Sequence, residues 1–286
     1  MNRLLVLVAL FLTACASAPM ATPVARTDWS GVEAALGRSG SAQPGNVYKF
    51  GFPRSDLDVR IGGVRLKPAL ALGSWAAFMD LPNGYTMAMG DLVLTEGEVN
   101  DVISALQAGG IEQSALHNHV LGETPRVMYL HFSGHGEAVA LARTLRAALE
   151  RTKTPLQPSA GTAPPPDLPA SDMDRILGYP GKPNGGVLQY SVPRTERIVE
   201  HGTEVPPAAG TATAINFQPT GNGRAAISGD FVMLANEMNP VIRELRNGGI
   251  DITALHSHML DEEPRLFFMH FWANEDAVKL ATALRR

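Results

Sequence analysis

The chain has 286 residues, a formal net charge of −4 at pH 7 and a single cysteine. This small negative charge argues against a general binder of nucleic acids or anionic membranes, which would need an excess of Lys and Arg. One cysteine excludes an internal disulfide bond and any metal site made of several thiolates. The length is sufficient for two domains of ordinary size.

The first 14 residues are predicted to be an export signal. Arg3 gives the segment a positive start, and residues 4–12 form an apolar run that is too short to span a bilayer. The run ends in Leu12-Thr13-Ala14-Cys15, which resembles the lipobox of bacterial lipoproteins. That resemblance implies that Cys15 is diacylated and becomes the acylated N-terminus after cleavage. An ordinary signal peptide with a chance cysteine is the alternative.

Cleavage before Cys15 would leave 286 − 14 = 272 residues. Residues 15–28 are small and Pro-containing, so we expect them to form a flexible tether between the lipid and the folded part. The expected location is the cell envelope. In a Gram-negative cell, Ala16 after the cysteine favours the periplasmic side of the outer membrane. In other bacteria, the anchor would lie on the extracytoplasmic face of the plasma membrane.

From residue 29 onward the chain repeats itself at an offset of 139 to 141 positions, as in residues 47–54 (VYKFGFPR) against 187–194 (VLQYSVPR). We therefore predict two similar units, at residues 29–151 and 172–286. Between them, residues 152–171 are rich in Pro, Ala and Ser without apolar periodicity, which is typical of a solvated connector. Whether the units are separate domains or share one core stays open.

Each unit is predicted to alternate strand pairs with two main helices. Pro82-Asn83-Gly84 is a turn signal between two apolar runs, which indicates a hairpin. The expected strands of the first unit are Val47–Phe52, Ser74–Leu81, Tyr85–Leu94, Ala115–Val120 and Arg126–Phe132, and its helices are Glu96–Ala108 and Glu137–Leu149. The second unit repeats this pattern and ends in a helix at Glu275–Arg286. The predicted fold class is α+β, a tandem repeat with antiparallel strand pairs.

One motif, H-x-H-x-x-x-E-x-P-R-x-x-x-x-H-F, occurs in both units and contains 6 of the 8 histidines. The candidate metal ligands are His117, His119, His131, His256, His258 and His270. In a strand, the two histidines of H-x-H project from one face about 6.5 to 7 Å apart, close enough to bind one ion. His131 joins them only if the strand register places it on that face.

Three imidazoles and a carboxylate suit a divalent transition metal such as Zn, Mn, Fe, Ni or Cu. Glu123 and Glu262 are candidates for a fourth ligand or a general base acting on a metal-bound water. Arg126 and Arg265 could bind an anionic substrate, although orienting the neighbouring glutamates is the favoured role.

Other polar residues have simpler explanations. Asp91 and Asp230 each follow a glycine and are interpreted as turn or cap residues, with contact to the histidines as the alternative. Glu98 and Glu237 are expected to cap helices. His135 and His201 have no matched partner in the other unit and are left out of the site.

The H-x-H-x-x-x-E spacing resembles the first metal motif of cupins, but the flanking helices do not fit their all-β barrel. Across nearly the whole mature chain, the lipobox, the duplicated unit and the motif together resemble the DUF1259 family, the LppY/LpqO-type bacterial lipoproteins. This resemblance implies an exported lipoprotein with tandem units, and it assigns no activity.

The residues favour a lipid-anchored envelope protein that binds a divalent transition metal, for metal handling or for metal-dependent catalysis. The alternatives are a metal-free envelope module whose histidines pack in the core or between units, and metal-free acid–base or ligand binding. The expected partners are the membrane, through Cys15, and an envelope component or a small molecule, with no nucleic acid.

Overall fold

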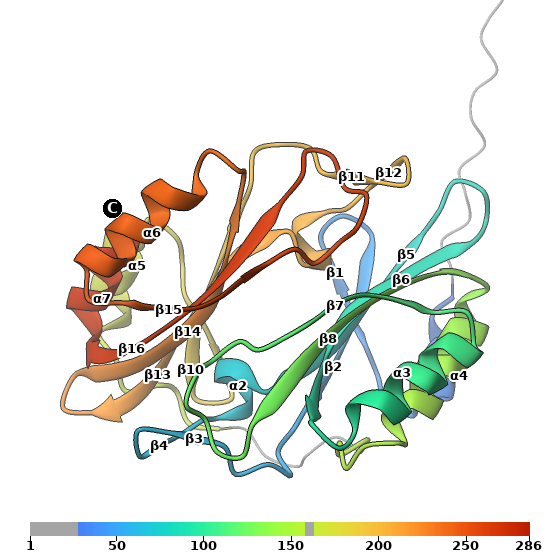
Figure 1. The fold of residues 1–286 in the computed structure, drawn as a ribbon, viewed down its shortest axis with the longest axis horizontal. Coiled ribbons are helices and arrows are strands. Elements are labelled where there is room, and N and C mark those ends of the chain that lie inside the picture. Colours follow the sequence, from blue (N-terminus) through green and yellow to red (C-terminus); the bar gives the residue numbers. More distant parts are fainter. Residues whose placement is uncertain (1–27, 158–162) are drawn as a thin grey trace, which may run out of the picture.

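Two six-stranded antiparallel sheets form the middle of the molecule, and helices cover the outer face of each sheet (Figure 1). The computed structural model describes residues 28–157 and 163–286. Each sheet belongs to one of the two sequence repeats. The predicted α+β fold with two similar units is therefore confirmed.

The first unit has a sheet in the order β1-β2-β5-β6-β8-β7. Its strands are β1 (Ser41–Gln43), β2 (Val47–Pro53), β5 (Gly73–Asp80), β6 (Thr86–Thr95), β7 (Glu112–His117) and β8 (Val127–Gly136). Its helices are α1 (Ser30–Leu36), α2 (Pro68–Ala71), α3 (Val99–Ala108) and α4 (Ala138–Leu149). A two-stranded ribbon is formed by β3 (Arg60–Ile61) and β4 (Val64–Arg65).

The second unit repeats this arrangement with the sheet order β15-β16-β14-β13-β10-β9. Its strands are β9 (Lys182–Asn184), β10 (Val187–Pro193), β13 (Ala212–Gly221), β14 (Arg224–Met233), β15 (Asp251–His256) and β16 (Phe267–Asp276). Its helices are α5 (Ala170–Leu177), the 3₁₀ helix η1 (Pro207–Ala209), α6 (Met238–Asn247) and α7 (Ala277–Arg285). The matching ribbon is β11 (Val199–Glu200) with β12 (Thr203–Glu204).

Each sheet buries its outer face under the helices of its own unit. Because side chains alternate along a strand, Phe50 and Phe52 of β2 face the helices while Lys49 faces the opposite way. On α4, Leu141 and Leu145 recur at helical spacing and pack against this face. The second unit has an equivalent core around Phe217 and Phe271.

The inner faces of the two sheets pack against each other, so the units share buried surface. One cluster combines strand residues of unit 1, such as Met87, with Val205 and Phe268 of unit 2. A second cluster reverses the roles, combining Val187 of unit 2 with unit 1 residues that include Tyr129. An approximate two-fold rotation that exchanges the two units therefore also exchanges these two clusters.

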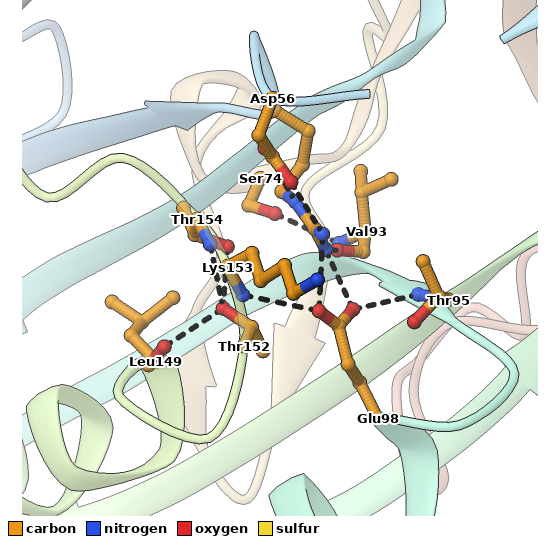
Figure 2. Close-up of polar contacts among 10 residues, drawn as sticks. Asp56, Ser74, Val93, Thr95, Glu98, Leu149, Thr152, Lys153 and Thr154 are labelled. Carbon is orange, nitrogen blue, oxygen red and sulfur yellow. Dashed lines mark hydrogen bonds and ion pairs between the residues drawn. The ribbon is translucent and has the colours of Figure 1, made fainter. Parts of the chain in front are cut away.

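An ion cluster fixes the start of α3 to the end of β2. The buried Arg54 guanidinium pairs with Asp56 and Glu98 at 3.0 and 2.8 Å. Glu98 also accepts hydrogen bonds from the backbone N–H groups of Thr95 and Lys153, between which it lies in Figure 2. Glu98 therefore makes no side-chain cap to α3, contrary to the sequence interpretation. Arg194, Glu196 and Glu237 repeat the arrangement in unit 2.

Several elements differ from prediction. The strand expected at 115–120 is β7, which begins at Glu112, contains a register shift between Gln113 and Ala115, and ends at His117. The helices α1 and α5 were not expected, and α5 begins at Ala170, inside the segment interpreted as a connector. These helices have only 7 and 8 residues, which is shorter than the periodic run by which a helix is identified in a sequence. Among the described residues, no helix is long and apolar enough to cross a membrane.

Candidate metal centre

The strand register brings three polar residues of unit 1 into one row on the inner face of the sheet. His131 in β8 lies between Asp91 of β6 on one side and Ala115 of β7 on the other. His117 pairs with Tyr129, two positions further along the same strands. Residues that pair directly across antiparallel strands share a face, so His117, His131 and Asp91 all face the other unit.

Unit 2 has the same arrangement, formed by the equivalent residues. His270 in β16 lies between Asp230 of β14 and Ala254 of β15, and His256 pairs with Phe268. The two rows face each other across the interface between the sheets. Six of the eight histidines thus meet at the approximate two-fold axis of the molecule.

His119 and His258 lie beyond the ends of β7 and β15, where contacts with the opposite unit position them. The hydroxyl of Thr253 donates to the backbone carbonyl of His119 at 2.5 Å, and the hydroxyl of Ser114 donates to that of His258 at 2.5 Å. The ring of His119 stacks on Tyr129 at 3.4 Å between centroids, and His258 stacks on Phe268 at 3.5 Å. These contacts fix both histidines next to the two rows of strand residues described above.

The six rings form two layers of three. Within unit 2, the ring centroids of His256 lie 4.9 Å from those of both His258 and His270, with interplanar angles of 26° and 24°. Within unit 1, the centroids of His117 lie 5.0 Å from those of both His119 and His131, with angles of 23° and 11°.

The two layers lie face to face. His117 stacks on His256 at 3.6 Å, while His119 stacks on His270 and His131 stacks on His258, both at 3.7 Å. Each contact joins the two units. The layers are therefore about as far apart as the ions of a two-metal site, which are typically separated by about 3.5–4 Å.

The ring nitrogens within each layer converge. In unit 1, the possible ligand atoms of His117, His119 and His131 all lie within 4.8 Å of one another. In unit 2, the same holds for His256, His258 and His270, and His117 also belongs to this group. These are the two groups of metal-binding geometry within the described ranges, 28–157 and 163–286, and both consist of histidines only.

The nitrogens that converge have no hydrogen-bond partner. The Nε2 atom of each of the six rings is buried, and none of the six has a hydrogen-bond partner among the described residues. An unpaired buried polar atom costs roughly 1–3 kcal/mol, so six together would be a large penalty. Two cations, one within each layer, would satisfy all six.

Backbone carbonyls select the ring tautomer that a metal requires. The Nδ1 atom of His270 lies 2.8 Å from the carbonyl of Gly229, and that of His117 lies 3.1 Å from the carbonyl of Asn118. A carbonyl only accepts, so Nδ1 carries the proton and Nε2 keeps its lone pair. His256 makes a longer contact of the same kind with Ser257.

Burial keeps the rings neutral, which is the form that binds metal. It lowers the pKa of His117 to about 3, with a further contribution from the adjacent His256, and it lowers the pKa of His256 to about 4. The pKa values of the other four rings are also well below the ordinary histidine value because of burial and the neighbouring imidazoles.

Asp91 and Asp230 belong to the centre, and the sequence interpretation of them as turn or cap residues is wrong. The Oδ2 atom of Asp91 lies 3.5 Å from the Nε2 atom of His119 and 3.7 Å from that of His131. Asp230 lies 3.5 Å from His258 in the same way. Two ligand atoms bound tetrahedrally to one zinc ion at about 2.1 Å would be roughly 3.4 Å apart, close to these separations.

The carboxyl groups of the centre hold protons more tightly than ordinary aspartates. Burial raises the pKa of Asp91 to about 7, against an opposing effect of the Lys49 ammonium. Burial also raises the pKa of Asp230 well above its usual value, and the charge of Asp91 adds to this shift. A divalent cation would offset both effects by displacing the protons.

The remaining predicted site residues lie in the turns that follow the H-x-H segments. Glu262 is buried and accepts hydrogen bonds from the Leu266 N–H and from Arg265, which also donates to the carbonyls of Met259 and Leu260. These contacts hold the Glu262 carboxylate within its own turn. Glu123 is likewise buried, and Arg126 is exposed. Cys15 lies outside the described residues.

The sequence contained a signal for the two missed carboxylates. Asp91 and Asp230 are matched across the repeat in segments that otherwise alternate as strands, which places both residues inside a strand. The preceding Gly90 suggested a turn. Close packing requires a glycine at this position instead, because a Cβ there would lie 2.2 Å from the carbonyl of Trp75 and 2.7 Å from the ring of Phe132.

Comparison with known proteins identifies a family whose function is unknown. A family model described as Domain of Unknown Function (DUF1259) matches residues 30–151 and 171–286. No curated protein and no solved structure matches the chain. The two matched regions coincide with the two structural units.

Proposed function

The chain belongs to the DUF1259 family, whose function is unknown, and from this premise we propose that it binds two divalent transition-metal ions in a centre shared by both units. One ion would be held by His117, His119, His131 and Asp91. The other would be held by His256, His258, His270 and Asp230. Histidine nitrogen and carboxylate oxygen form a donor set suited to zinc and its first-row neighbours.

The observation that supports this proposal best is the set of six buried Nε2 atoms without partners. Buried polar atoms in proteins are nearly always paired, so six unpaired nitrogens in one place need a common explanation. Their convergence within each layer provides one. Protonation would not satisfy them, because burial and mutual repulsion hold the pKa values of the rings low.

The alternative is a metal-free module in which the histidines pack between the units. Stacking of His119 on Tyr129 and of His258 on Phe268 fits that reading. Stacking alone, however, requires no histidine, since phenylalanine would fill the same space without the cost of buried nitrogens. A metal-free module also leaves unexplained why an aspartate, Asp91 or Asp230, lies beside the histidines in each unit.

The centre is closed, which favours metal handling or a structural metal over reactions on large substrates. The side chains of His119, His131 and His258 are 15%, 7% and 9% exposed. An ion could be held here with limited access for water. Glu123 and Glu262 remain candidates for proton transfer only if an open coordination position faces their turns.

Elemental analysis tests the proposal directly. The protein would be produced from Ala16 without an affinity tag, purified without chelator, and offered zinc, manganese, iron, nickel and copper ions in separate titrations. We expect about two equivalents of one metal per chain. A His119→Ala/His131→Ala variant and a His258→Ala/His270→Ala variant should each retain about one equivalent.

The matched control is His135→Ala/His201→Ala. These two histidines contact each other, with ring centroids 5.8 Å apart, and lie outside both metal-binding groups. Their removal should leave the stoichiometry unchanged. Failure to take up any of the five metals would contradict the proposal and leave the interaction module as the better hypothesis.

We further propose that the protein is anchored in the cell envelope by a lipid on Cys15. Support comes from the apolar segment and the Leu12-Thr13-Ala14-Cys15 sequence alone. Replacement of Cys15 by serine should move the protein from the membrane fraction to the soluble fraction. A variant that stays in the membrane fraction would contradict the lipid anchor.

A further inference from the structure

One half of the centre has a lysine where the other half has a glutamine. Lys49 in β2 and Gln189 in β10 occupy equivalent positions in the repeat, and each faces the space between the sheets. The difference is a formal positive charge in unit 1 only. A charge beside one of two otherwise similar cation sites must affect them unequally.

Lys49 lies close to the Asp91 half. Its Nζ atom lies 4.0 Å from the centre of the Trp75 ring, and Trp75 pairs directly with Asp91 across β5 and β6. Lys49 and Asp91 interact electrostatically, since the carboxylate partly offsets the fall in the pKa of Lys49, which burial lowers to about 8. In unit 2, Ala214 takes the place of Trp75 and pairs with Asp230.

The backbone contacts of the two residues match. The Lys49 ammonium donates to the carbonyl of Ala208 at 3.1 Å, and the Gln189 amide donates to the carbonyl of Ala69 at 2.8 Å. Ala69 and Ala208 are equivalent in the repeat. Glutamine is thus compatible with this contact, so the charge can be removed while a hydrogen bond to the same carbonyl remains available.

We propose that Lys49 makes the centre fill in order, with the Asp230 half binding the first divalent cation and the Asp91 half binding the second more weakly. This inference rests on the proposed two-ion function. The ammonium repels a divalent cation beside Asp91. The Asp230 half has glutamine in the matching position and lacks this penalty.

Zinc titration against a competing chromophoric chelator would resolve the two binding steps. For the wild-type protein from Ala16, we expect dissociation constants that differ by about tenfold or more, beyond the statistical factor for two equal sites. Lys49→Gln should strengthen the weaker step and bring the two constants together. Lys49→Arg, which keeps the charge, should leave them apart.

Reciprocal and half-site variants assign the steps. Gln189→Lys should weaken the tighter step. His131→Ala, which removes a ligand of the Asp91 half, should retain the tighter step, whereas His270→Ala should lose it. Thermal unfolding of each metal-free variant would show that the chains are folded.

The outcomes separate this inference from the proposed function. Two bound ions with constants that Lys49→Gln and Gln189→Lys leave unchanged would overturn the ordering by Lys49 and preserve the metal centre. Retention of the tighter step in His270→Ala, with its loss in His131→Ala, would reverse the order and also overturn it. Absence of zinc from the wild-type protein would overturn both.

Discussion

Asp91 and Asp230 are the residues that should set how the proposed metal centre responds to pH. Burial raises the pKa of Asp91 to about 7 and that of Asp230 well above the usual range, whereas it lowers the pKa values of the histidines. Near neutral pH the imidazoles are therefore already neutral with Nε2 free, and the carboxyl groups would be the ones to lose protons on binding of the proposed metal.

We accordingly expect metal affinity to rise with pH between about 6 and 8. A carboxyl group with a raised pKa is protonated on the acid side of this range, so each proton displaced weakens binding by roughly tenfold per pH unit below that pKa. Zinc competition titrations at pH 6 and 8 would measure the change. Asp91→Asn should bind more weakly at pH 8 and lose part of the pH dependence.

Calorimetry in buffers of different ionisation enthalpy provides the check, because it counts the protons released on binding. Asp91→Asn should release fewer protons than the wild type at pH 6. An affinity that is flat from pH 6 to 8, or protons released in equal number by both proteins, would contradict the assignment to these carboxyl groups.

Among single residues, the sequence predicted those whose side-chain type is rare in the chain and recurs at matching positions in both units. Six histidines in two matched motifs could be recognised as candidate ligands from the sequence alone. Asp91 and Asp230 were undervalued because aspartate is common in turns and both follow glycine. Their role depends on strand pairing with His131 and His270, a long-range relation that no local pattern specifies.

Strand register is the element-scale property on which the centre depends. Gly90 allows β6 to lie close to its neighbours, because a side chain there would meet the Trp75 carbonyl and the Phe132 ring. The next residue in β6 is Asp91. Any shift of β6 relative to β5 and β8 therefore moves the carboxylate away from His119 and His131.

We expect Gly90→Ala to lower the stability of the protein by about 1–3 kcal/mol, the usual cost of overpacking, and to weaken zinc binding in the Asp91 half. Chemical denaturation and zinc titration would measure the two effects. Gly51→Ala is the matched control, since Gly51 lies in β2, is exposed, and has nothing within 4 Å of an added Cβ. Equal zinc affinity in both variants would show that the register tolerates the added carbon.

Sequence periodicity predicted the longer elements because their apolar spacing is a local property. The β5–β6 hairpin and the helices α3, α4 and α7 lie within the predicted segments or close to their ends. The register shift in β7 was not predictable in this way, because a bulge is defined by the partner strand. Because of this shift, Ala115 and His117 pair with His131 and Tyr129, so His117 shares the face of the sheet on which His131 lies.

At the scale of the whole molecule, the two units form one centre. Each layer of histidines stacks on the layer of the other unit, and hydrogen bonds from Ser114 and Thr253 cross the same interface. The repeat in the sequence revealed two similar units, but it carried no information about how they face each other. The sequence therefore supported one site per unit and left their stacking undetermined.

Because the proposed ligands of both units meet at this interface, a bound metal should stabilise the whole fold. A ligand that binds only the folded state adds about 2.7 kcal/mol of stability at a free concentration of 100 times its dissociation constant. For a chain of this size, that corresponds to a rise in melting temperature of roughly 5–10 °C. We expect zinc to produce such a rise in the wild-type protein and in His135→Ala/His201→Ala.

The informative comparison is His117→Ala/His256→Ala, which removes the central stacked pair. One ring comes from each layer, their centroids lie 3.6 Å apart, and His117 belongs to both metal-binding groups, so their loss should abolish most of the zinc-induced rise in melting temperature. The same variant without metal should melt close to the metal-free wild type or above it, because two unpaired buried nitrogens are removed along with the stacked rings. A large loss of stability in the metal-free state, together with an undiminished rise on adding zinc, would mean that this pair serves packing and that the ions bind elsewhere.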